Sequence, residues 1–200
     1  MRRAMAAGDL LDAPLRDFLD TISGEGPAPG GGSVAAIVVA MAAGLAAMVA
    51  RASKEAWPEA GGAVAQAETF RARAAPLAEA DAEAYIEAVT VLRARDGLEP
   101  RYRDLKLRAA LERAAEIPMR IAEAGSDVAS LAALLTENGN TEVRGDAAAA
   151  AVLAEGGTRA AAKLVEINLG ATEDDPRVRH VRLLVDVAAE AADRALAAVE

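Results

Sequence analysis

One stretch, residues 26–50, constrains the fold of this chain more than any other, because a glycine-rich turn runs directly into a helix of small and apolar residues. Pro29 precedes three successive glycines, Gly30, Gly31 and Gly32, so the backbone here can turn sharply or approach a ligand closely. Ser33 is a favourable N-cap, and no charged residue follows it before Arg51. A helix that begins this way presents free N–H groups and a positive dipole end. The turn therefore either forms an anion site or only shapes a tight approach to a buried helix.

The apolar content of the chain is large but consists mostly of small side chains. Of its 200 residues, 53% are hydrophobic and only 2% are aromatic. Alanine, leucine, glutamate and arginine dominate, all of them good helix formers, and no window shows the sustained alternation of a strand. Small side chains bury little area each, so such a core needs several long helices or a partner subunit. We expect one all-α domain over residues 1–200, an orthogonal or up-down bundle of six to eight helices that forms a homodimer.

Charge and composition exclude several classes of function. A net charge of −9 argues against a nucleic-acid partner and against an anionic membrane surface. The chain has no cysteine and one histidine, His180, so we expect no disulfide, thiolate site, metal centre or cofactor. The apolar run 34–50 is slightly short for a membrane span and is followed at once by Arg51 and Lys54, so we interpret it as a core or interface helix. Residues 1–11 lack the apolar run of a secretory signal, which favours a cytoplasmic protein.

Capping residues, prolines and glycines set the expected helix boundaries. The expected ranges are approximately 12–22, 33–55, 63–95, 100–124, 126–137, 146–169 and 176 to the C-terminus. Pro76 is expected to kink or divide the third helix, because a proline inside a helix removes a hydrogen bond. Gly125 is expected to end the fourth helix, and Asp175 to cap the last one before Pro176.

Asp81 is the acidic residue whose position is most informative. It lies four residues from both Leu77 and Tyr85, on the predicted apolar face of its helix. A carboxylate on such a face is costly unless it is paired or used, and burial raises its pKa toward a value that suits general acid–base catalysis. The alternative is that Asp81 belongs to a solvated acidic helix surface, as we expect for Glu79 and Glu83. The pattern alone favours neither.

Other polar residues have simple structural interpretations. Asp146 opens an alanine-rich helix and is expected to be its N-cap, and Asn140 is expected in a turn. Asn168 precedes Gly170 and is expected to contribute to a C-terminal cap. Lys54 lies at the end of the second helix, where a cation favours the negative dipole end. His180 lies in a charged stretch and is expected at the surface.

An ordered set of motifs gives the chain a resemblance to a known family. The set consists of PAPGGGS at 27–33, Lys54 with Trp57, Asp81 with Ala84 and Tyr85, Ile117 with Pro118, Gly139 with Asn140, Asp146, and Asn168. These motifs resemble those of the cyclodeaminase/cyclohydrolase family, which contains the C-terminal domain of formiminotransferase-cyclodeaminase and stand-alone methenyltetrahydrofolate cyclohydrolases. The resemblance runs from about Leu11 to the end of the chain. It implies an all-α homodimer that binds folate in a cleft lined by these motifs.

The resemblance also implies a reaction and roles for residues. Cyclodeaminases of the family close formiminotetrahydrofolate to the methenyl form and release ammonia, and its cyclohydrolases add water to the methenyl form. Both reactions pass through a tetrahedral carbon between N5 and N10 and need a group that moves protons. The matching position for that group is Asp81. The implied substrate-binding residues are Pro29, Gly30, Gly31, Gly32, Ser33, Lys54, Asn140, Asp146 and Asn168, with Lys54 pairing with a glutamate-tail carboxylate.

The chain departs from the family pattern at three places. Glu142 stands where a second asparagine is usual, and Gly145 stands where a serine usually precedes Asp146. The segment 53–56, which contains Lys54, is less basic than the usual lysine cluster. An alternative function therefore stays open, namely a non-catalytic folate-binding module or a helical dimerisation module.

Overall fold

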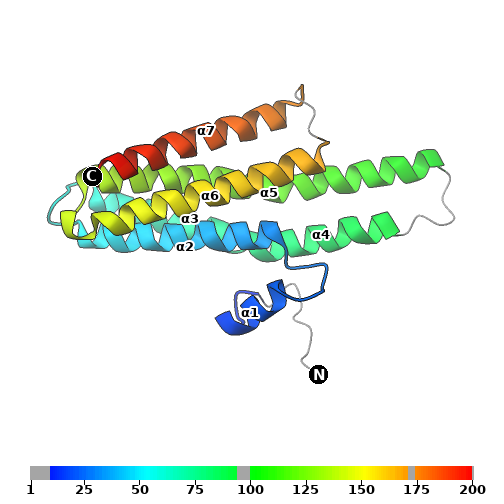
Figure 1. Cartoon of the computed structure of the whole chain (residues 1–200), viewed down its shortest axis with the longest axis horizontal. Coiled ribbons are helices and arrows are strands. Elements are labelled where there is room, and N and C mark those ends of the chain that lie inside the picture. Colours follow the sequence, from blue (N-terminus) through cyan, green and yellow to red (C-terminus); the bar gives the residue numbers. More distant parts are fainter. Residues whose placement is uncertain (1–9, 94–99, 171–173, 200) are drawn as a thin grey trace.

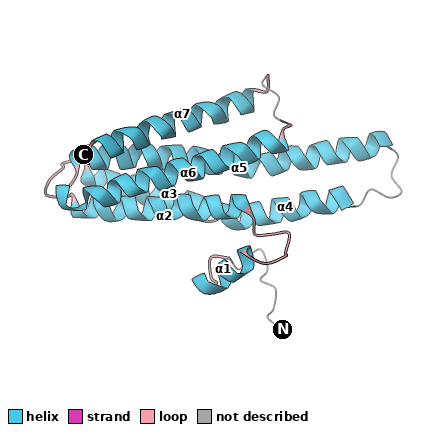
Figure 2. Cartoon of the chain, in the orientation of Figure 1, coloured by secondary structure: helices cyan, strands magenta, loops and turns pink. Residues whose placement is uncertain are grey.

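The computed structural model describes residues 10–93, 100–170 and 174–199, and every regular element among them is helical (Figure 2). The elements are α1 (Leu15–Ile22), α2 (Gly31–Ala52), α3 (Ala60–Ala74), α4 (Leu77–Arg93), α5 (Pro100–Asn138), the 3₁₀-helix η2 (Thr141–Val143), α6 (Arg144–Asn168) and α7 (Pro176–Ala197). The expected all-α class is therefore confirmed, with seven α-helices in the described part of the chain.

The long helices form an up-down bundle. In Figure 1, α2, the consecutive pair α3 and α4, then α5, α6 and α7 run along one long axis and alternate in direction. Helix α2 packs against α3, α4, α5 and α6, whereas α7 packs on α5 and α6. Helix α1 lies apart from this bundle in Figure 1 and contributes one buried side chain, Phe18. Helix α2 and α7 therefore occupy different sides of the molecule.

Glycine at two crossings lets the central helices approach closely. A Cβ at Gly125 of α5 would lie 2.3 Å from Thr158 Oγ1 of α6 and 3.2 Å from Val39 Cγ2 of α2. A Cβ at Gly157 of α6 would lie 2.6 Å from the same Val39 atom. The rest of this core is largely alanine and valine, with side chains that fill the narrow space between closely packed helices. Small residues thus replace the aromatic volume that the chain lacks.

The largest difference from the expected helix boundaries is in α5. It runs unbroken over 39 residues with Pro118 inside it, so Gly125 does not end a helix and Ser126 does not cap one. Gly125 is instead required by the contact with Thr158, and Ser126 is buried. A glycine selected for close packing has the same sequence signature as a glycine that ends a helix.

Three further helices begin at a different residue from the one expected. Helix α1 begins after Pro14, not at Asp12. Helix α2 begins after Gly30, so Ser33 lies within its first turn and is not the N-cap. Helix α6 begins after Val143, so Asp146 also lies in a first turn. The second helix ends at Ala52 and the third begins at Ala60, and the expected end of the third helix near 95 lies outside the described residues.

Other boundaries are confirmed. The third expected helix is divided beside Pro76 into α3 and α4. Asp175 caps α7, where its side chain accepts a hydrogen bond from the Arg177 backbone N–H. Helix α6 ends at Asn168 and is followed by Gly170, which adopts a positive φ of 75°.

Helix α2 has the length and apolar composition of a membrane span. Its best 18-residue window has a mean hydropathy of 2.3, and it is the one described helix that meets this criterion. However, 61% of that window is buried inside the bundle, as in a core helix. This packing agrees with the interpretation of α2 as a core or interface helix.

Candidate functional site

The carboxylate of Asp81, on α4, lies directly against the first turn of α2. A Cβ built on Gly32 would lie 2.0 Å from Asp81 Oδ1 and 2.4 Å from Asp81 Cγ, far inside van der Waals contact. Any side chain at position 32 would therefore displace the carboxylate. The glycine-rich turn and the acid that the sequence singled out do meet, although 49 positions separate them (81 minus 32).

Ser33 holds the same carboxylate from the second side. Its buried hydroxyl donates to Ala78 O at 2.8 Å, and its Oγ lies 3.2 Å from Asp81 Oδ2. Burial raises the pKa of the Asp81 carboxyl, while hydrogen bonds from the Ser33 side chain and backbone oppose that rise. The group at the positive end of α2 is thus a carboxyl of the protein itself and not a bound ligand. Burial makes the protonated form of this carboxyl more favourable than it is in water.

A cavity of about 260 Å³ opens beside Asp81. Its walls come from the glycine-rich turn, α4, α5 and α6, and the lining residues are Pro27, Gly30, Gly31, Gly32, Asp81, Tyr85, Ala114, Pro118, Leu164, Ile167 and Asn168. The structure therefore brings five of the predicted site residues to one cavity, namely Gly30, Gly31, Gly32, Asp81 and Asn168. Ser33 lies behind Asp81, and Pro29 is not part of the lining.

Pro118 explains how Asn168 is held at this cavity. A proline has no N–H, so the carbonyl four residues earlier, that of Ala114, lacks its helical partner. Asn168 Nδ2, from α6, donates to Ala114 O at 2.9 Å and replaces that bond. The amide of Asn168 is therefore fixed by a helix other than its own, and it does not serve as the expected C-terminal cap.

The remaining predicted residues lie at the other end of α2. Helix α2 has 22 residues, which corresponds to a length of about 33 Å. Lys54 and Asn140 line an open hollow of about 540 Å³ beyond its C-terminal end, together with Arg51 and Glu142. Asp146 is exposed in the first turn of α6, directly after this hollow in the chain. Within a single chain, the motifs therefore do not all line one cleft.

Asn140 has a structural role at that end. Its backbone N–H donates to Ser53 Oγ at 2.9 Å, and its Nδ2 donates to Ala52 O at 3.2 Å. Its Oδ1 accepts from the Glu142 N–H at 2.9 Å and caps η2. Asn140 thus joins the end of α2 to the turn before α6, as a turn residue was expected to do.

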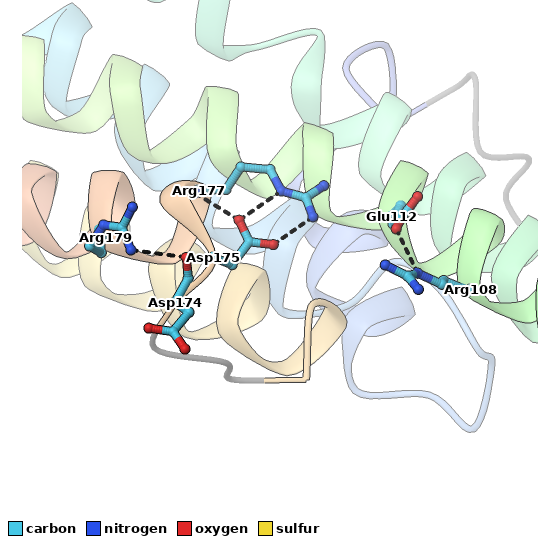
Figure 3. Close-up of polar contacts among 6 residues, drawn as sticks. All are labelled: Arg108, Glu112, Asp174, Asp175, Arg177 and Arg179. Atoms are coloured by element: carbon cyan, nitrogen blue, oxygen red, sulfur yellow. Dashed lines mark hydrogen bonds and ion pairs between the residues drawn. The ribbon is translucent and has the colours of Figure 1, made fainter.

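Near the start of α7, Arg108 and Arg177 are paired with carboxylates, and Arg179 donates to the Asp174 backbone carbonyl at 2.9 Å (Figure 3). Asp175 accepts from Arg177 at its backbone N–H, Nε and Nη2, and these bonds lower the pKa of the Asp175 carboxyl to about 2. Arg108 Nε donates to Glu112 Oε1 at 3.0 Å. These side chains line a hollow of about 520 Å³ between α5 and the start of α7. The cluster fixes the start of α7, and Arg108 and Arg177, the two arginines that line the hollow, are each paired with a carboxylate.

Sequence reasoning missed two features of the cavity. Tyr85 and Ile167 form a half-exposed apolar rim, and Tyr85 was expected to face the core. The role of Pro118 was also missed, although its signal is present, because a proline inside a helix always leaves one carbonyl without its helical partner. Within residues 10–93, 100–170 and 174–199, no three His, Cys, Asp or Glu side chains form a group that fits a metal ion.

The sequence is similar to a known protein family and to two named relatives. The sequence profile of the family described as Formiminotransferase-cyclodeaminase matches residues 14–186. The chain is 30% identical over 168 residues to methenyltetrahydrofolate cyclohydrolase of Methylorubrum extorquens, a match that covers 80% of this chain and 81% of that relative. It is 32% identical to formimidoyltransferase-cyclodeaminase of Rattus norvegicus, over 83% of this chain and 32% of that longer protein.

A solved structure agrees. The crystal structure of formiminotetrahydrofolate cyclodeaminase from Thermotoga maritima superposes with a TM-score of 0.79 at 27% identity, covering 95% of this chain and 97% of that one. The family profile and the cyclohydrolase relative each span most of the chain, and the shared fold extends over nearly all of it. The chain therefore belongs to the formiminotransferase-cyclodeaminase family.

Proposed function

We propose that this protein is an enzyme of folate one-carbon metabolism that acts at the N5–N10 bridge of tetrahydrofolate, as a formiminotetrahydrofolate cyclodeaminase or a methenyltetrahydrofolate cyclohydrolase. One observation carries the proposal: a desolvated carboxylate, Asp81, lies in a cavity against the Gly32 backbone. The named relatives, a cyclohydrolase and cyclodeaminases, support the choice of reaction.

The same carboxylate serves either reaction. In the cyclodeaminase reaction, N10 adds to the formimino carbon, and a proton must leave N10 and reach the amino group before ammonia departs. In the cyclohydrolase reaction, water adds to the methenyl carbon, and a proton must leave that water while N5 is protonated as its bond to the carbon breaks. A carboxyl whose pKa burial raises above its usual range can accept the first proton and deliver the second.

The cavity supplies the surroundings that this chemistry needs. Gly31 and Gly32 bring backbone next to the reacting carbon, and Asn168 presents an amide fixed by Ala114. Tyr85 offers an aromatic edge for a flat ring. We assign substrate positioning to these groups and proton transfer to Asp81, with no metal or cofactor beyond the folate substrate.

The direct test follows absorbance while purified protein acts on methenyl- and formiminotetrahydrofolate. Asp81→Asn should lower turnover by about 10²–10⁴-fold, the usual contribution of a positioned acid–base group. Glu83→Gln, which removes an exposed carboxylate from the same helix, should leave turnover unchanged. Wild-type protein that turns over neither compound, or full activity of Asp81→Asn, contradicts the proposal. Tight folate binding without turnover would identify a binding module instead.

We further propose that the protein is a cytoplasmic homodimer and that residues 1–200 form a single domain. Two observations support the dimer: the core is built from small side chains, and one side of α2 leaves large apolar side chains exposed. The acidic net charge and the burial of most of α2 support an aqueous compartment. Light scattering at micromolar concentration tests the dimer directly.

A further inference from the structure

A second cavity, of about 300 Å³, lies between α5, the end of α6 and the start of α7. Its inner surface is apolar and comes from two segments, with Ala115 and Met119 on α5, and Val165 and Leu169 at the end of α6. The two members of each pair are four residues apart, so they lie next to each other on one side of the helix. Ala115 and Val165 are buried, so the cavity reaches into the bundle.

This cavity is separate from the Asp81 cavity. Ala114 and Pro118 of α5 line the Asp81 cavity, whereas Ala115 and Met119, one position further along, line the second one. Neighbouring positions on a helix point in directions about 100° apart, so α5 presents a different side to each cavity. Among the described residues, none lines both cavities, and the proposed folate reaction uses none of the residues that line the second.

Four charged side chains line the exposed part of the second cavity, namely Glu112, Glu116, Arg120 and Arg177. Two of them are carboxylates and two are guanidinium groups, so their charges balance. Glu112 and Arg177 are already paired with other residues, and Figure 3 shows both pairs. Glu116 and Arg120 are exposed and form no ion pair with any residue that the structure describes.

Glu116 and Arg120 do not pair with each other, although their spacing favours an ion pair. A glutamate four residues before a cation is the favourable order on a helix. Glu155 and Arg159 have the same spacing on α6, and they form that ion pair. Glu116 and Arg120 lie about 6 Å apart along the axis of α5. One negative and one positive group are therefore both available beside the apolar surface of the cavity.

We propose that this second cavity binds a small α-amino acid with an apolar side chain. The apolar side chain of the ligand lies between the α5 and α6 pairs, its ammonium group pairs with Glu116, and its carboxylate pairs with Arg120. Ligand sites of this kind are mostly apolar, with a few polar groups that fix the orientation of the ligand.

Size and charge together select this class of ligand. The volume of about 300 Å³ is at the lower end of the roughly 300–1,000 Å³ typical of ligand sites, so the ligand is small. An apolar acid would leave Glu116 without a partner, and an apolar amine would leave Arg120 without one. A zwitterion pairs with both and keeps the charges of the cavity balanced.

The methyl group of Met119 reports on binding directly. The chain has five methionines, so NMR of protein labelled at the methionine methyl groups gives few signals, and the Met119→Leu variant identifies the signal of Met119. L-leucine, L-valine or L-phenylalanine should shift this signal until it saturates, while the signals of Met41 and Met48 on α2 stay unchanged. If none of the three amino acids produces a saturable shift of the Met119 signal, the proposal is overturned.

Matched ligands and variants test the two charge pairs. Isocaproate is leucine without its ammonium group, and isopentylamine is leucine without its carboxylate, so each should bind about tenfold or more weakly than L-leucine. Glu116→Gln and Arg120→Gln change exposed side chains and should each weaken L-leucine binding by about the same factor. Arg101→Gln, at the start of the same helix, should leave it unchanged. Equal binding of the three ligands, or of the variants and wild type, overturns the proposal.

Competition with folate separates the second cavity from the Asp81 cavity. Tetrahydrofolate at saturating concentration should leave L-leucine bound, because no described residue lines both cavities. Displacement of L-leucine by tetrahydrofolate would assign this cavity to the folate site and overturn the proposal. None of these measurements uses turnover, so they decide this site separately from the proposed folate reaction.

Discussion

Asp81 is held in a position that costs stability. Its carboxylate is largely removed from water, its hydrogen bonds come from one residue, Ser33, and no cation pairs with it among the described residues. Burial dominates this balance and raises the pKa of the carboxyl. Groups whose surroundings disfavour the charged form are concentrated at functional sites, because the resulting shift in pKa suits proton transfer.

Removing the charge of Asp81 should therefore stabilise the protein while abolishing activity. A raised pKa in the folded state means that stability is full below the unfolded pKa and declines as pH rises through the folded pKa. Asn cannot be deprotonated, so Asp81→Asn should be more stable than wild type at pH 8.5, and the difference in stability should be smaller at pH 5. Urea unfolding at the two pH values measures this difference. A variant that is less stable than wild type at pH 8.5 would show that burial does not dominate.

Gly32 should be more sensitive to a methyl group than any exposed helical glycine. Because a Cβ there overlaps the Asp81 carboxylate, Gly32→Ala should move Asp81 and lower turnover by about 10²-fold or more. Gly62→Ala, in α3, places its Cβ in open space and should gain up to about 1 kcal/mol from helix propensity, with normal turnover. Circular dichroism confirms folding of both variants. Equal turnover in the two would show that the contact with Asp81 is not needed.

At the scale of elements, α5 and α6 are tied together by a hydrogen bond that neither helix makes alone. Pro118 frees the buried Ala114 carbonyl of α5, and Asn168 of α6 satisfies it. The proline therefore does not break α5, because a neighbouring helix replaces the bond that it removes. The same exchange fixes an amide at the wall of the Asp81 cavity.

This coupling can be measured with a double-mutant cycle. Asn168→Ala leaves Ala114 O buried without a partner and should cost about 1–3 kcal/mol. In Pro118→Ala the restored backbone N–H can bond to Ala114 O, so Asn168→Ala should cost much less in that background. Urea unfolding of the four proteins gives the interaction energy. Additive effects of the two substitutions would show that Pro118 and Asn168 are independent.

At the scale of the whole molecule, the bundle has two unlike sides. One side is covered by α7, whereas the outer side of α2 leaves Met41 and Met48 exposed. Large apolar side chains exposed along one helix of a bundle indicate an interaction surface. Such a surface adds the buried area that a core of alanines does not supply within one chain.

A charge on this side of α2 should separate the two copies of the proposed homodimer. Met41→Glu would place a carboxylate from each copy in an apolar interface, so light scattering should report a monomer at micromolar concentration. Thermal unfolding of wild type should depend on protein concentration, and that of the variant should not. Leu183→Glu, which adds the same charge to α7, should remain a dimer. A dimeric Met41→Glu would assign the interface to another surface.

Sequence alone determined the class of the fold and one end of the site. Three kinds of signal specify the helices: the helix-forming composition, the apolar run after the glycines, and the boundary residues Pro76 and Asp175. These signals act within a few residues of the chain. The spacing of Asp81 along α4 left a buried acid and a solvated one equally open, and the three glycines left open an anion site or a tight approach to a buried helix. Both proved to be parts of one contact.

Tertiary structure decided what those signals mean. Gly125 resembled a helix end and is a packing contact, and Ser33 resembled an N-cap and holds Asp81. Lys54, Asn140 and Asp146 follow the other motifs in sequence but lie a helix length from Asp81. Local sequence carries caps and periodicity, whereas contacts between distant segments depend on how whole helices pack, which no short window specifies.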